Sequence, residues 1–294
     1  MRIVATQKLP GSAWDELPKV DLLDVWPPPA RLSGVQALIA AVTRIGVAEL
    51  DLLPDLQLVA NYGVGYDTVD VMACRERGIS VTNTPGVLDA AVADLTLALI
   101  LACRRHLVAS DRFVRAGLWR RSWARPELLG HDLAGSTLGL VGMGRIGSQV
   151  ALRAEAFGMH VAFHRRDDGL PLDELLRTAD VVSLHVPLTP ETRGLISRKQ
   201  LALLGDGATL VNTARGAIVD EDALVDELVS GRISAGLDVF VEEPLIPERL
   251  LDLPNVVLTP HVASATVETR AAMTRVLVDN VLAFVSGKPL PNAV

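Results

Sequence analysis

Short aliphatic runs alternate with helical segments from one end of the chain to the other, and this alternation limits the possible folds more than any other feature. In the first part we expect strands at residues 2–6, 37–42, 58–63 and 79–83. In the second part we expect them at residues 136–142, 160–164, 181–186, 208–213, 234–240 and 256–260. Strands that alternate with helices are typical of α/β folds with parallel sheets. Only 4% of residues are aromatic, so the cores must be aliphatic, which suits strands buried on both faces.

Size and charge narrow the class of protein further. A chain of 294 residues is long for one hydrophobic core and ordinary for two domains. The net charge is −7 and no block of basic residues occurs, which argues against binding to nucleic acid. The most apolar run, residues 95–103, is too short to span a bilayer. The start of the chain does not resemble a secretion signal, so we expect a soluble, cytoplasmic protein with no membrane partner. Cys74 and Cys103 are isolated, which predicts neither a disulfide nor a metal site.

The strongest local motif is a glycine-rich turn. Gly142, Gly144 and Gly147 form the pattern G-x-G-x-x-G directly after an apolar strand and directly before a helical stretch. Such glycines allow a tight turn, a close approach of the backbone to a pyrophosphate, and close packing of helix on strand. The pattern alone is weak, because a glycine turn can be without a ligand. The strand–turn–helix context makes a dinucleotide site the better interpretation.

The end of the next strand bears on which dinucleotide is bound. NAD sites usually carry an acidic residue about 20 residues after the glycines. Here Arg165 holds that position and Arg166 follows it. Two guanidinium groups suit the 2′-phosphate of NADP(H), which we therefore expect to be preferred, with NAD(H) still possible. The alternative is a solvated loop in which Asp167 or Asp168 neutralises the arginines.

Three polar residues follow apolar strands of the second part, where open α/β sheets bind their ligands. Arg215 could hold a carboxylate bidentately, and a protonated His261 could give a proton to a keto oxygen. Glu243 could stabilise the charged imidazole. Asp238, an acid within an apolar strand, is best explained by a nicotinamide amide as its partner. Spacing cannot show that these residues meet in space.

Each of these residues also has a simpler interpretation. Arg215 could form a surface ion pair, Glu243 could lie in an exposed Glu-Glu-Pro turn, and His261 could be a satisfied loop histidine. We expect His185, within a buried-looking strand, to be structural or to line the cofactor site rather than to be catalytic.

Several segments in the same order resemble the D-isomer-specific 2-hydroxyacid dehydrogenase family, and the resemblance covers nearly the whole chain. Within that family the chain is most similar to the glyoxylate/hydroxypyruvate reductases. The matching stretches are ANYGVGYDTVD (60–70), VTNTPGVLDAAVADLTLALIL (81–101), LGLVGMGRIG (138–147), SLHVPLTPETRGLI (183–196), NTARGAIVDEDAL (212–224), GLDVFVEEP (236–244) and TPHVASAT (259–266).

The resemblance implies roles for individual residues. Arg215, Glu243 and His261 match the family's catalytic triad, with the histidine as proton donor. The backbone N–H groups of Gly63, Val64 and Gly65 match a loop that holds the substrate carboxylate. Further positions match residues of the cofactor site, namely Arg145, Ile146, Arg165, Val186, Thr213, Asp238 and Ser264.

The resemblance also implies the domain organisation. It implies a flavodoxin-like substrate domain of residues 1–98 plus 266–294, a dinucleotide-binding domain of residues 99–265, and a cleft between the two Rossmann-like domains. We expect a long helix over residues 87–110, a terminal helix over residues 266–286, and a homodimer formed through an arm near residues 117–133.

The implied activity is reduction of a small 2-keto acid, of the glyoxylate or hydroxypyruvate type, to the D-2-hydroxy acid by hydride transfer from NADPH. Two alternatives stay open. One is a reductase of another 2-keto acid, such as 2-ketogluconate. The other is a dinucleotide-sensing binding protein similar to the transcriptional corepressors that resemble this family.

Overall fold

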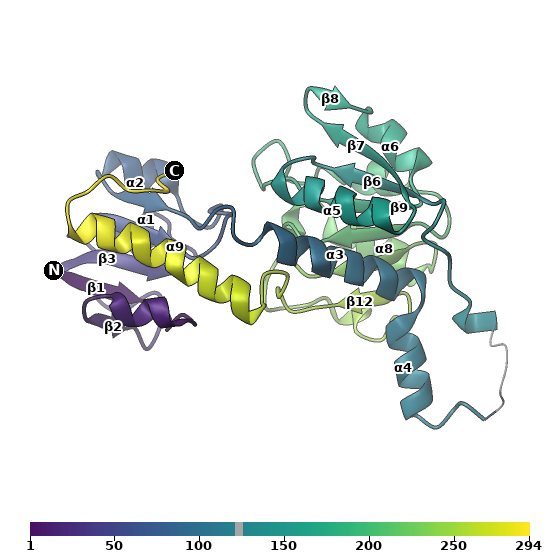
Figure 1. Ribbon diagram of the computed structural model, residues 1–294, viewed down its shortest axis with the longest axis horizontal. Coiled ribbons are helices and arrows are strands. Elements are labelled where there is room, and N and C mark those ends of the chain that lie inside the picture. The colour runs from purple at the N-terminus through teal and green to yellow at the C-terminus, as the bar shows by residue number, and fades with distance from the viewer. Residues whose placement is uncertain (121–125) are drawn as a thin grey trace. The chain divides into compact units, whose positions relative to one another are not determined.

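The computed structural model describes residues 1–120 and 126–294, and it divides the chain into two compact units (Figure 1). Unit 1 comprises Met1–Leu88 and Ser264–Val294, and unit 2 comprises Asp89–Ala263. The first division therefore lies ten residues before the expected boundary at residue 98, and the second lies two residues before the one at 265. The reason for the larger shift is helix α3, Asp89–Arg104, since Ala93, Leu97, Leu99 and Ile100 belong to an aliphatic core of unit 2.

Unit 1 contains a five-stranded parallel sheet with the order β2-β1-β3-β4-β5. The same order occurs in flavodoxin-like folds, so the flavodoxin-like prediction is confirmed. The strands are β1 (Arg2–Ala5), β2 (Val20–Leu22), β3 (Val35–Ala40), β4 (Leu58–Asn61) and β5 (Ser80–Thr82). The helices are η1 (Ser12–Glu16), α1 (Val47–Asp51), α2 (Val71–Glu76) and α9 (Val267–Val285).

Helix α9 returns the end of the chain to unit 1, as the terminal helical periodicity predicts. The hydroxyl of Thr266 caps its first turn by accepting a hydrogen bond from the N–H of Thr269 at 3.1 Å. The helix packs against β4 and η1. The buried Tyr62 also holds the helix in place, because its hydroxyl donates a hydrogen bond to the backbone carbonyl of Arg270 in α9 at 2.8 Å.

Unit 2 contains a seven-stranded sheet with the order β12-β11-β10-β9-β6-β7-β8, parallel except for the β7–β8 pair. The chain runs from β6 outward to β7 and then returns to the other side of β6 at β9. The order in which strands are added therefore reverses between β6 and β9, which is where doubly wound sheets bind nucleotides. The strands are β6 (Thr137–Val141), β7 (His160–Arg165), β8 (Asp168–Gly169), β9 (Val181–Leu184), β10 (Thr209–Asn212), β11 (Ser234–Leu237) and β12 (Val256–Leu258).

Helices cover both faces of this sheet. Helix α3 packs beside α5 on one face (Figure 1), where Leu97, Ile100, Leu138 and Val150 belong to one aliphatic core. A second aliphatic core on the other face includes side chains of α6, α7 and α8. The helices of unit 2 are α3, α4 (Leu107–Arg115), η2 (Pro126–Leu128), α5 (Arg145–Ala156), α6 (Leu172–Thr178), α7 (Arg198–Leu201), η3 (Gly216–Ile218), α8 (Glu221–Val229) and η4 (Glu248–Leu250). The predicted α/β class with Rossmann-like parallel sheets is confirmed.

The helix expected over residues 87–110 is two helices. Helix α3 ends at Arg104, and His106 has a left-handed backbone (φ 47°) before α4 begins. The carbonyl of Arg104 accepts a hydrogen bond from the N–H of His131 at 2.8 Å instead of continuing the helix. A Cβ on Gly130 would lie 2.2 Å from that carbonyl oxygen, so only glycine allows the chain to pass so close to the helix end.

Two short strands of the structure, β2 and β8, are not among those predicted from the sequence. Strand β2 has three residues with Asp21 at its centre, and β8 has only two exposed residues. Neither is long enough to produce a hydrophobic alternation that a sequence could reveal.

Candidate active site

Three loops that carry the predicted acid–base residues leave the same edge of the unit 2 sheet. Arg215 lies three residues beyond β10, and His261 lies three residues beyond β12. Asp238 directly follows β11, which pairs in parallel with both of these strands. The carboxyl ends of parallel strands meet at one edge, so the fold gathers these residues there.

Glu243 and His261 contact each other directly. A carboxylate oxygen of Glu243 lies 2.7 Å from Nδ1 of His261. An ionised carboxylate can only accept, so Nδ1 donates this hydrogen bond and Nε2 is left as the nitrogen that can exchange a proton with a ligand. The other carboxylate oxygen accepts from the N–H of Phe240 at 3.0 Å. Glu243 is thus not the freely solvated turn residue of the simpler interpretation.

The environment of Glu243 favours its charged form. Burial acts to raise the pKa of this carboxyl. The hydrogen bonds from His261 and from the Phe240 N–H, together with the charges of His261 and Arg215, act more strongly and hold the pKa below its ordinary value of 4.5. The attraction to Arg215 also shows that the guanidinium belongs to the surroundings of the Glu243–His261 pair.

The backbone of His261 is held in an uncommon conformation. Its φ of 53° is in the left-handed region, which a non-glycine residue adopts only when its surroundings impose it. Its N–H donates to the carbonyl of Asp238 at 2.9 Å. The carboxylate of Asp238 accepts from the hydroxyl of Thr259 at 2.6 Å and from the N–H groups of Val262 and Ala263, each at 2.9 Å. The fully buried Asp238 therefore fixes the loop on both sides of the histidine.

This arrangement corrects the expected placement of Asp238. The residue lies just after β11 rather than within a strand, because β11 ends at Leu237. A carboxylate has about four acceptor positions, and three of them are already used by the His261 loop. The geometry therefore assigns its main contacts to the histidine loop, and a nicotinamide amide would have one acceptor position left.

The loop of Arg215 is shaped by Asn212, the last residue of β10. Its amide donates to the carbonyl of Arg215 at 2.9 Å, and its carbonyl oxygen accepts from the N–H of Ala214 at 3.0 Å. Arg215 itself donates to the carbonyl of Ala214 at 2.7 Å. The hydroxyl of Thr213, a predicted cofactor residue, lies 3.0 Å from that of Thr96 on α3.

Gly216 brings the Arg215 and Glu243 loops together. A Cβ at this position would lie 2.1 Å from the carbonyl carbon of Phe240 and 2.5 Å from the nitrogen of Val241. No side chain fits in that gap. Sequence reasoning missed both Asn212 and Gly216. The available signal was a polar residue at the end of an apolar strand and a glycine directly after the candidate arginine.

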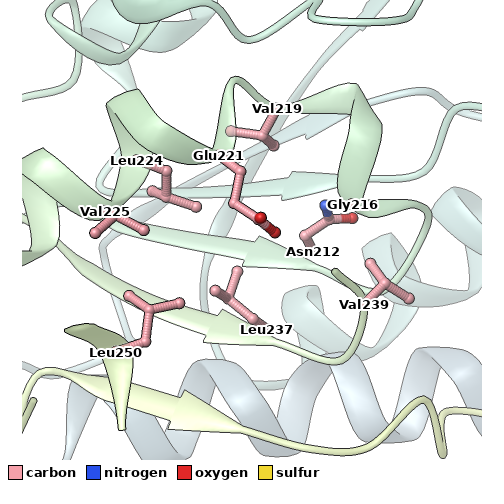
Figure 2. Close-up of a pocket in the computed structure, with 9 residues that line it drawn as sticks. All are labelled: Asn212, Gly216, Val219, Glu221, Leu224, Val225, Leu237, Val239 and Leu250. Carbon is pink, nitrogen blue, oxygen red and sulfur yellow. The ribbon is translucent and has the colours of Figure 1, made fainter. Parts of the chain in front are cut away.

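Behind these loops lies a small hollow in the core of unit 2 (Figure 2). Its volume of about 10 Å³ is comparable to the room that one water molecule needs, so it holds neither a keto acid nor a dinucleotide. Residues from β10, η3, α8, β11 and η4 line it, together with two from loops, namely Asn212, Gly216, Val219, Glu221, Leu224, Val225, Leu237, Val239 and Leu250.

The glycine-rich turn has the geometry that its motif predicts. Gly142 has a φ of 102°, and a Cβ there would lie 2.5 Å from the carbonyl oxygen of His185. A Cβ on Gly147 would lie 2.3 Å from the carbonyl oxygen of Gly142, so this residue allows α5 to pack on the turn. Around Gly144, in contrast, no atom lies within 4 Å of the Cβ position among the described residues. That open side at the start of α5 fits a pyrophosphate, which needs close access to backbone N–H groups.

Other predicted cofactor residues surround this turn. Arg145 begins α5 and lies 3.7 Å from the carboxylate of Asp89, and Ile146 packs against the core beneath it. A Cβ on Gly142 would lie 3.0 Å from the side chain of Val186. Burial lowers the pKa of His185 to about 4, and its Nε2 lies 2.9 Å from the hydroxyl of Ser183. A histidine that is neutral at physiological pH does not suit the role of proton donor.

Arg165 and Arg166 lie at the exposed end of β7, where the chain turns into β8. The carboxylate of Asp168 accepts the N–H of its own neighbour Gly169 at 2.8 Å. In residues 1–120 and 126–294, neither guanidinium forms an ion pair within 4.0 Å. The pKa of the exposed Glu191 carboxyl is lowered mainly by a hydrogen bond with Thr189, and the nearby charge of Arg166 lowers it further. Within the described ranges, neither Asp167 nor Asp168 therefore forms an ion pair with these arginines, although Asp168 lies opposite Arg165 in the β7–β8 pair.

The predicted carboxylate loop belongs to unit 1, as does Ser264. The side chain of Asn61 donates to the carbonyls of Gly63 and Gly65, and that of Asn83 donates to the carbonyl of Val64. The N–H of Gly63 is taken by the carbonyl of Asn61 at 3.1 Å, which removes one of the three expected donors. In a trans peptide the N–H points opposite to the preceding carbonyl, so the N–H groups of Val64 and Gly65 point away from these asparagines.

Comparison with known proteins places this geometry in a family. Residues 97–263 match the model of the D-isomer specific 2-hydroxyacid dehydrogenase NAD binding domain. A glyoxylate reductase of Korarchaeum cryptofilum is 44% identical, and the match covers 100% of this chain and 95% of that protein. The chain belongs to this family.

Solved structures of the family agree over the whole chain. A protein of Thermus thermophilus is 49% identical with a TM-score of 0.92, and each chain is covered completely. An NADPH-dependent glyoxylate/hydroxypyruvate reductase of Sinorhizobium meliloti, in complex with NADP and malonate, is 39% identical with a TM-score of 0.88. That match covers 100% of this chain and 96% of the other. The family resemblance of the sequence is confirmed, and the protein is an NAD(P)-dependent oxidoreductase.

No group of three or more histidine, cysteine or acidic residues that could hold a metal ion occurs among the residues that the structure describes. Within the same described ranges, no helix is long and apolar enough to cross a membrane.

Proposed function

We propose that this family member reduces a small 2-keto acid of the glyoxylate or hydroxypyruvate type to the D-2-hydroxy acid, using NADPH and with His261 as the proton donor. The observation that carries the proposal is the 2.7 Å contact between Glu243 and His261 beside Arg215, within the unit that also holds the glycine-rich turn. The names of the relatives in Korarchaeum and Sinorhizobium support the substrate type.

Each residue supplies one part of the reaction. A bound nicotinamide dinucleotide supplies the hydride that reaches the keto carbon. The imidazolium of His261 gives its Nε2 proton to the keto oxygen as negative charge develops there. Glu243 orients that imidazole by accepting a hydrogen bond from Nδ1. The guanidinium of Arg215 suits both the carboxylate and the keto oxygen of the substrate.

Two further groups complete the proposed binding of ligands. The N–H groups of Val64 and Gly65 point away from Asn61 and Asn83, which bond the carbonyls of this loop. They are therefore suited to hold the substrate carboxylate. The glycine-rich turn and the start of α5 are suited to hold the pyrophosphate. Arg165 and Arg166 would bind the 2′-phosphate, for which their exposure is favourable, as is the absence of an ion pair to either of them among the described residues.

We also propose that the protein is a homodimer in the cytoplasm. Helix α4 buries none of its residues, and large apolar side chains are exposed on it and beside it, namely Leu107, Val114, Leu118, Trp119 and Leu129. Such a patch favours a second copy of the chain as its partner. The predicted arm near residues 117–133 includes residues 121–125, which lie outside the described residues. The two cysteines are free and buried, which suits a reducing compartment.

The proposal is tested by assaying the purified protein with a panel of 2-keto acids and following NADPH and NADH absorbance. We expect glyoxylate and hydroxypyruvate to be reduced with a higher kcat/KM than 2-ketogluconate, and faster with NADPH than with NADH. A higher kcat/KM for 2-ketogluconate would identify a reductase of bulkier acids. Tight dinucleotide binding without turnover of any keto acid would instead favour a sensing protein and contradict the proposed reaction.

A further inference from the structure

Glu221 lies directly behind the turn that carries Glu243. It is the first residue of α8, and one of its carboxylate oxygens accepts a hydrogen bond from the N–H of Val241 at 3.0 Å. Figure 2 shows its side chain directed from α8 toward Asn212, and it lines the small hollow described above. Nothing in the reaction described above uses this residue.

The position of Glu221 is itself well fixed. The carboxylate of Asp220 caps α8 by accepting from the N–H of Ala223 at 3.0 Å, and Ala223 and Leu224 are buried in the core. The first turn of α8 therefore has little freedom to move, and a hydrogen bond from it can set the position of a neighbouring loop.

The turn that carries Glu243 is bonded at two consecutive N–H groups by two different carboxylates. Glu243 accepts from the N–H of Phe240 within its own turn, and Glu221 accepts from the next N–H, that of Val241. Gly216 lies against the same peptide unit, since a Cβ there would lie 2.1 Å from the carbonyl carbon of Phe240. The Phe240–Val241 peptide is thereby located from α8 and from the Arg215 loop together.

We infer that Glu221 is a positioning residue, which sets the Glu243 turn so that the Glu243 carboxylate meets Nδ1 of His261. The inference deepens the proposed function and rests on it for its catalytic meaning. Its chain of contacts runs from the Glu221 carboxylate to the Val241 N–H, along the turn to Glu243, and from there to His261. The groups that face Glu243 are His261 and Arg215, and Glu221 acts on it only through the backbone.

Three substitutions separate this contact from a general effect of charge. Glu221→Ala removes the acceptor. Glu221→Asp keeps the charge but shortens the side chain by one methylene, so that it no longer reaches Val241. Glu221→Gln removes the charge and keeps an oxygen that can accept. The matched control is Asp222→Ala, because Asp222 is the exposed acidic residue next to it in the same first turn of α8.

The first readout is activity. We expect Glu221→Ala and Glu221→Asp to lower kcat on the order of tenfold, with KM for NADPH changed by no more than about twofold. The acid limb of the kcat profile should move to higher pH in these two variants, because the Phe240 N–H helps to hold the Glu243 pKa low. Glu221→Gln and Asp222→Ala should behave like the parent.

The second readout needs no substrate. The Nδ1 proton of His261 should give a downfield NMR resonance in the parent, assigned by its loss in His261→Gln. It should move upfield or broaden in Glu221→Ala and Glu221→Asp but remain in Glu221→Gln and Asp222→Ala. Thermal melting of each variant checks that it is folded. If Glu221→Ala does not fold, the difference between Glu221→Asp and Glu221→Gln in kcat and in the resonance decides whether Glu221 positions the turn.

The two readouts distinguish the possible failures. If the parent reduces no 2-keto acid, the proposed function fails, and the NMR resonance still decides the role of Glu221. If folded Glu221→Ala and Glu221→Asp keep the parent's kcat, acid limb and resonance, the positioning role is refuted. An equal loss in Asp222→Ala would assign the effect to helix charge and would also overturn the inference.

Discussion

The two ends of the unit 2 sheet are built in different ways. At the histidine end, formed by the loops after β10, β11 and β12, buried polar side chains fix the backbone. Asp238 is 0% exposed and Asn212 is 1% exposed, and each makes several hydrogen bonds to the loop that it supports. At the nucleotide end, formed by the loops after β6 and β7, glycines shape the turn and the charged residues Arg165 and Arg166 are exposed.

The difference indicates which properties each end can change. A loop fixed by buried hydrogen bonds has a single geometry, which a proton donor needs in order to be positioned. A substitution in such a loop leaves a buried polar group without its hydrogen-bond partner. An exposed pair of arginines makes few contacts, so its replacement alters binding without disturbing the fold. We expect chemistry to be rigidly determined at the histidine end and cofactor preference to be adjustable at the nucleotide end.

The largest effect should follow from replacing the proton donor. His261→Ala should lower kcat on the order of 10²–10⁴-fold, the contribution of a general acid, while the affinity for NADPH persists because the nucleotide end is unchanged. Steady-state kinetics with hydroxypyruvate and fluorescence titration with NADPH measure the two effects. Activity within a few-fold of the parent would exclude His261 as the acid.

Glu243→Gln should have the next largest effect. We expect kcat to fall about 10- to 150-fold, the equivalent of the roughly 1.5–3 kcal/mol of a hydrogen bond to a charged group. Because the pKa of Glu243 is lowered from its ordinary value of 4.5, the parent should keep an ionised Glu243, and the activity that depends on it, as pH falls toward that value and lose both only at lower pH. The acid limb due to Glu243 should be absent from the pH profile of the variant. An acid limb at the parent's pH in Glu243→Gln would contradict this assignment.

Asp238→Ala should test the rigidity of the histidine end through stability. It leaves the half-buried N–H of Val262, the buried N–H of Ala263 and the hydroxyl of Thr259 without their acceptor, so we expect a loss of about 1.5–3 kcal/mol in the free energy of unfolding. Urea denaturation measures it, with Asp222→Ala as an exposed control. Unchanged stability would show that the carboxylate does not hold this loop.

The smallest effect on overall activity should come from the nucleotide end. Replacing Arg165 with Asp and Arg166 with Ser should shift preference from NADPH toward NADH by about tenfold or more, with little change in melting temperature. The ratio of kcat/KM values for the two cofactors measures the shift. An unchanged ratio would refute the 2′-phosphate assignment and remove the proposed contrast between the two ends.

The same contrast explains how far the sequence could predict the structure. The glycine-rich turn was predictable because its demands are local: Gly142 needs a positive φ, Gly147 approaches the Gly142 carbonyl closely, and Gly144 leaves the start of α5 open. The contact between Glu243 and His261 was not predictable from spacing, since it depends on strands that pair across the sheet. The family resemblance joined these residues before the fold was known.

Other features depended on contacts that no local pattern encodes. The break after Arg104 depends on Gly130, which is distant in sequence and packs against the helix end. Asp238 lies beyond β11 because the hydrogen-bonded pairing of β11 with β12 stops at Leu237. Apolar residues continue past that point, so the sequence does not show where the strand ends. The expected domain boundary at residue 98 lies inside one continuous helix, α3, which belongs whole to unit 2.

The most direct test of the account is the product formed from hydroxypyruvate. Purified protein, NADPH and hydroxypyruvate should yield one D-glycerate for each NADPH oxidised, as chiral chromatography and absorbance would show, and His261→Ala should form it far more slowly. Formation of L-glycerate, or no oxidation of NADPH by protein that binds it, would contradict the proposed D-specific reduction of a 2-keto acid.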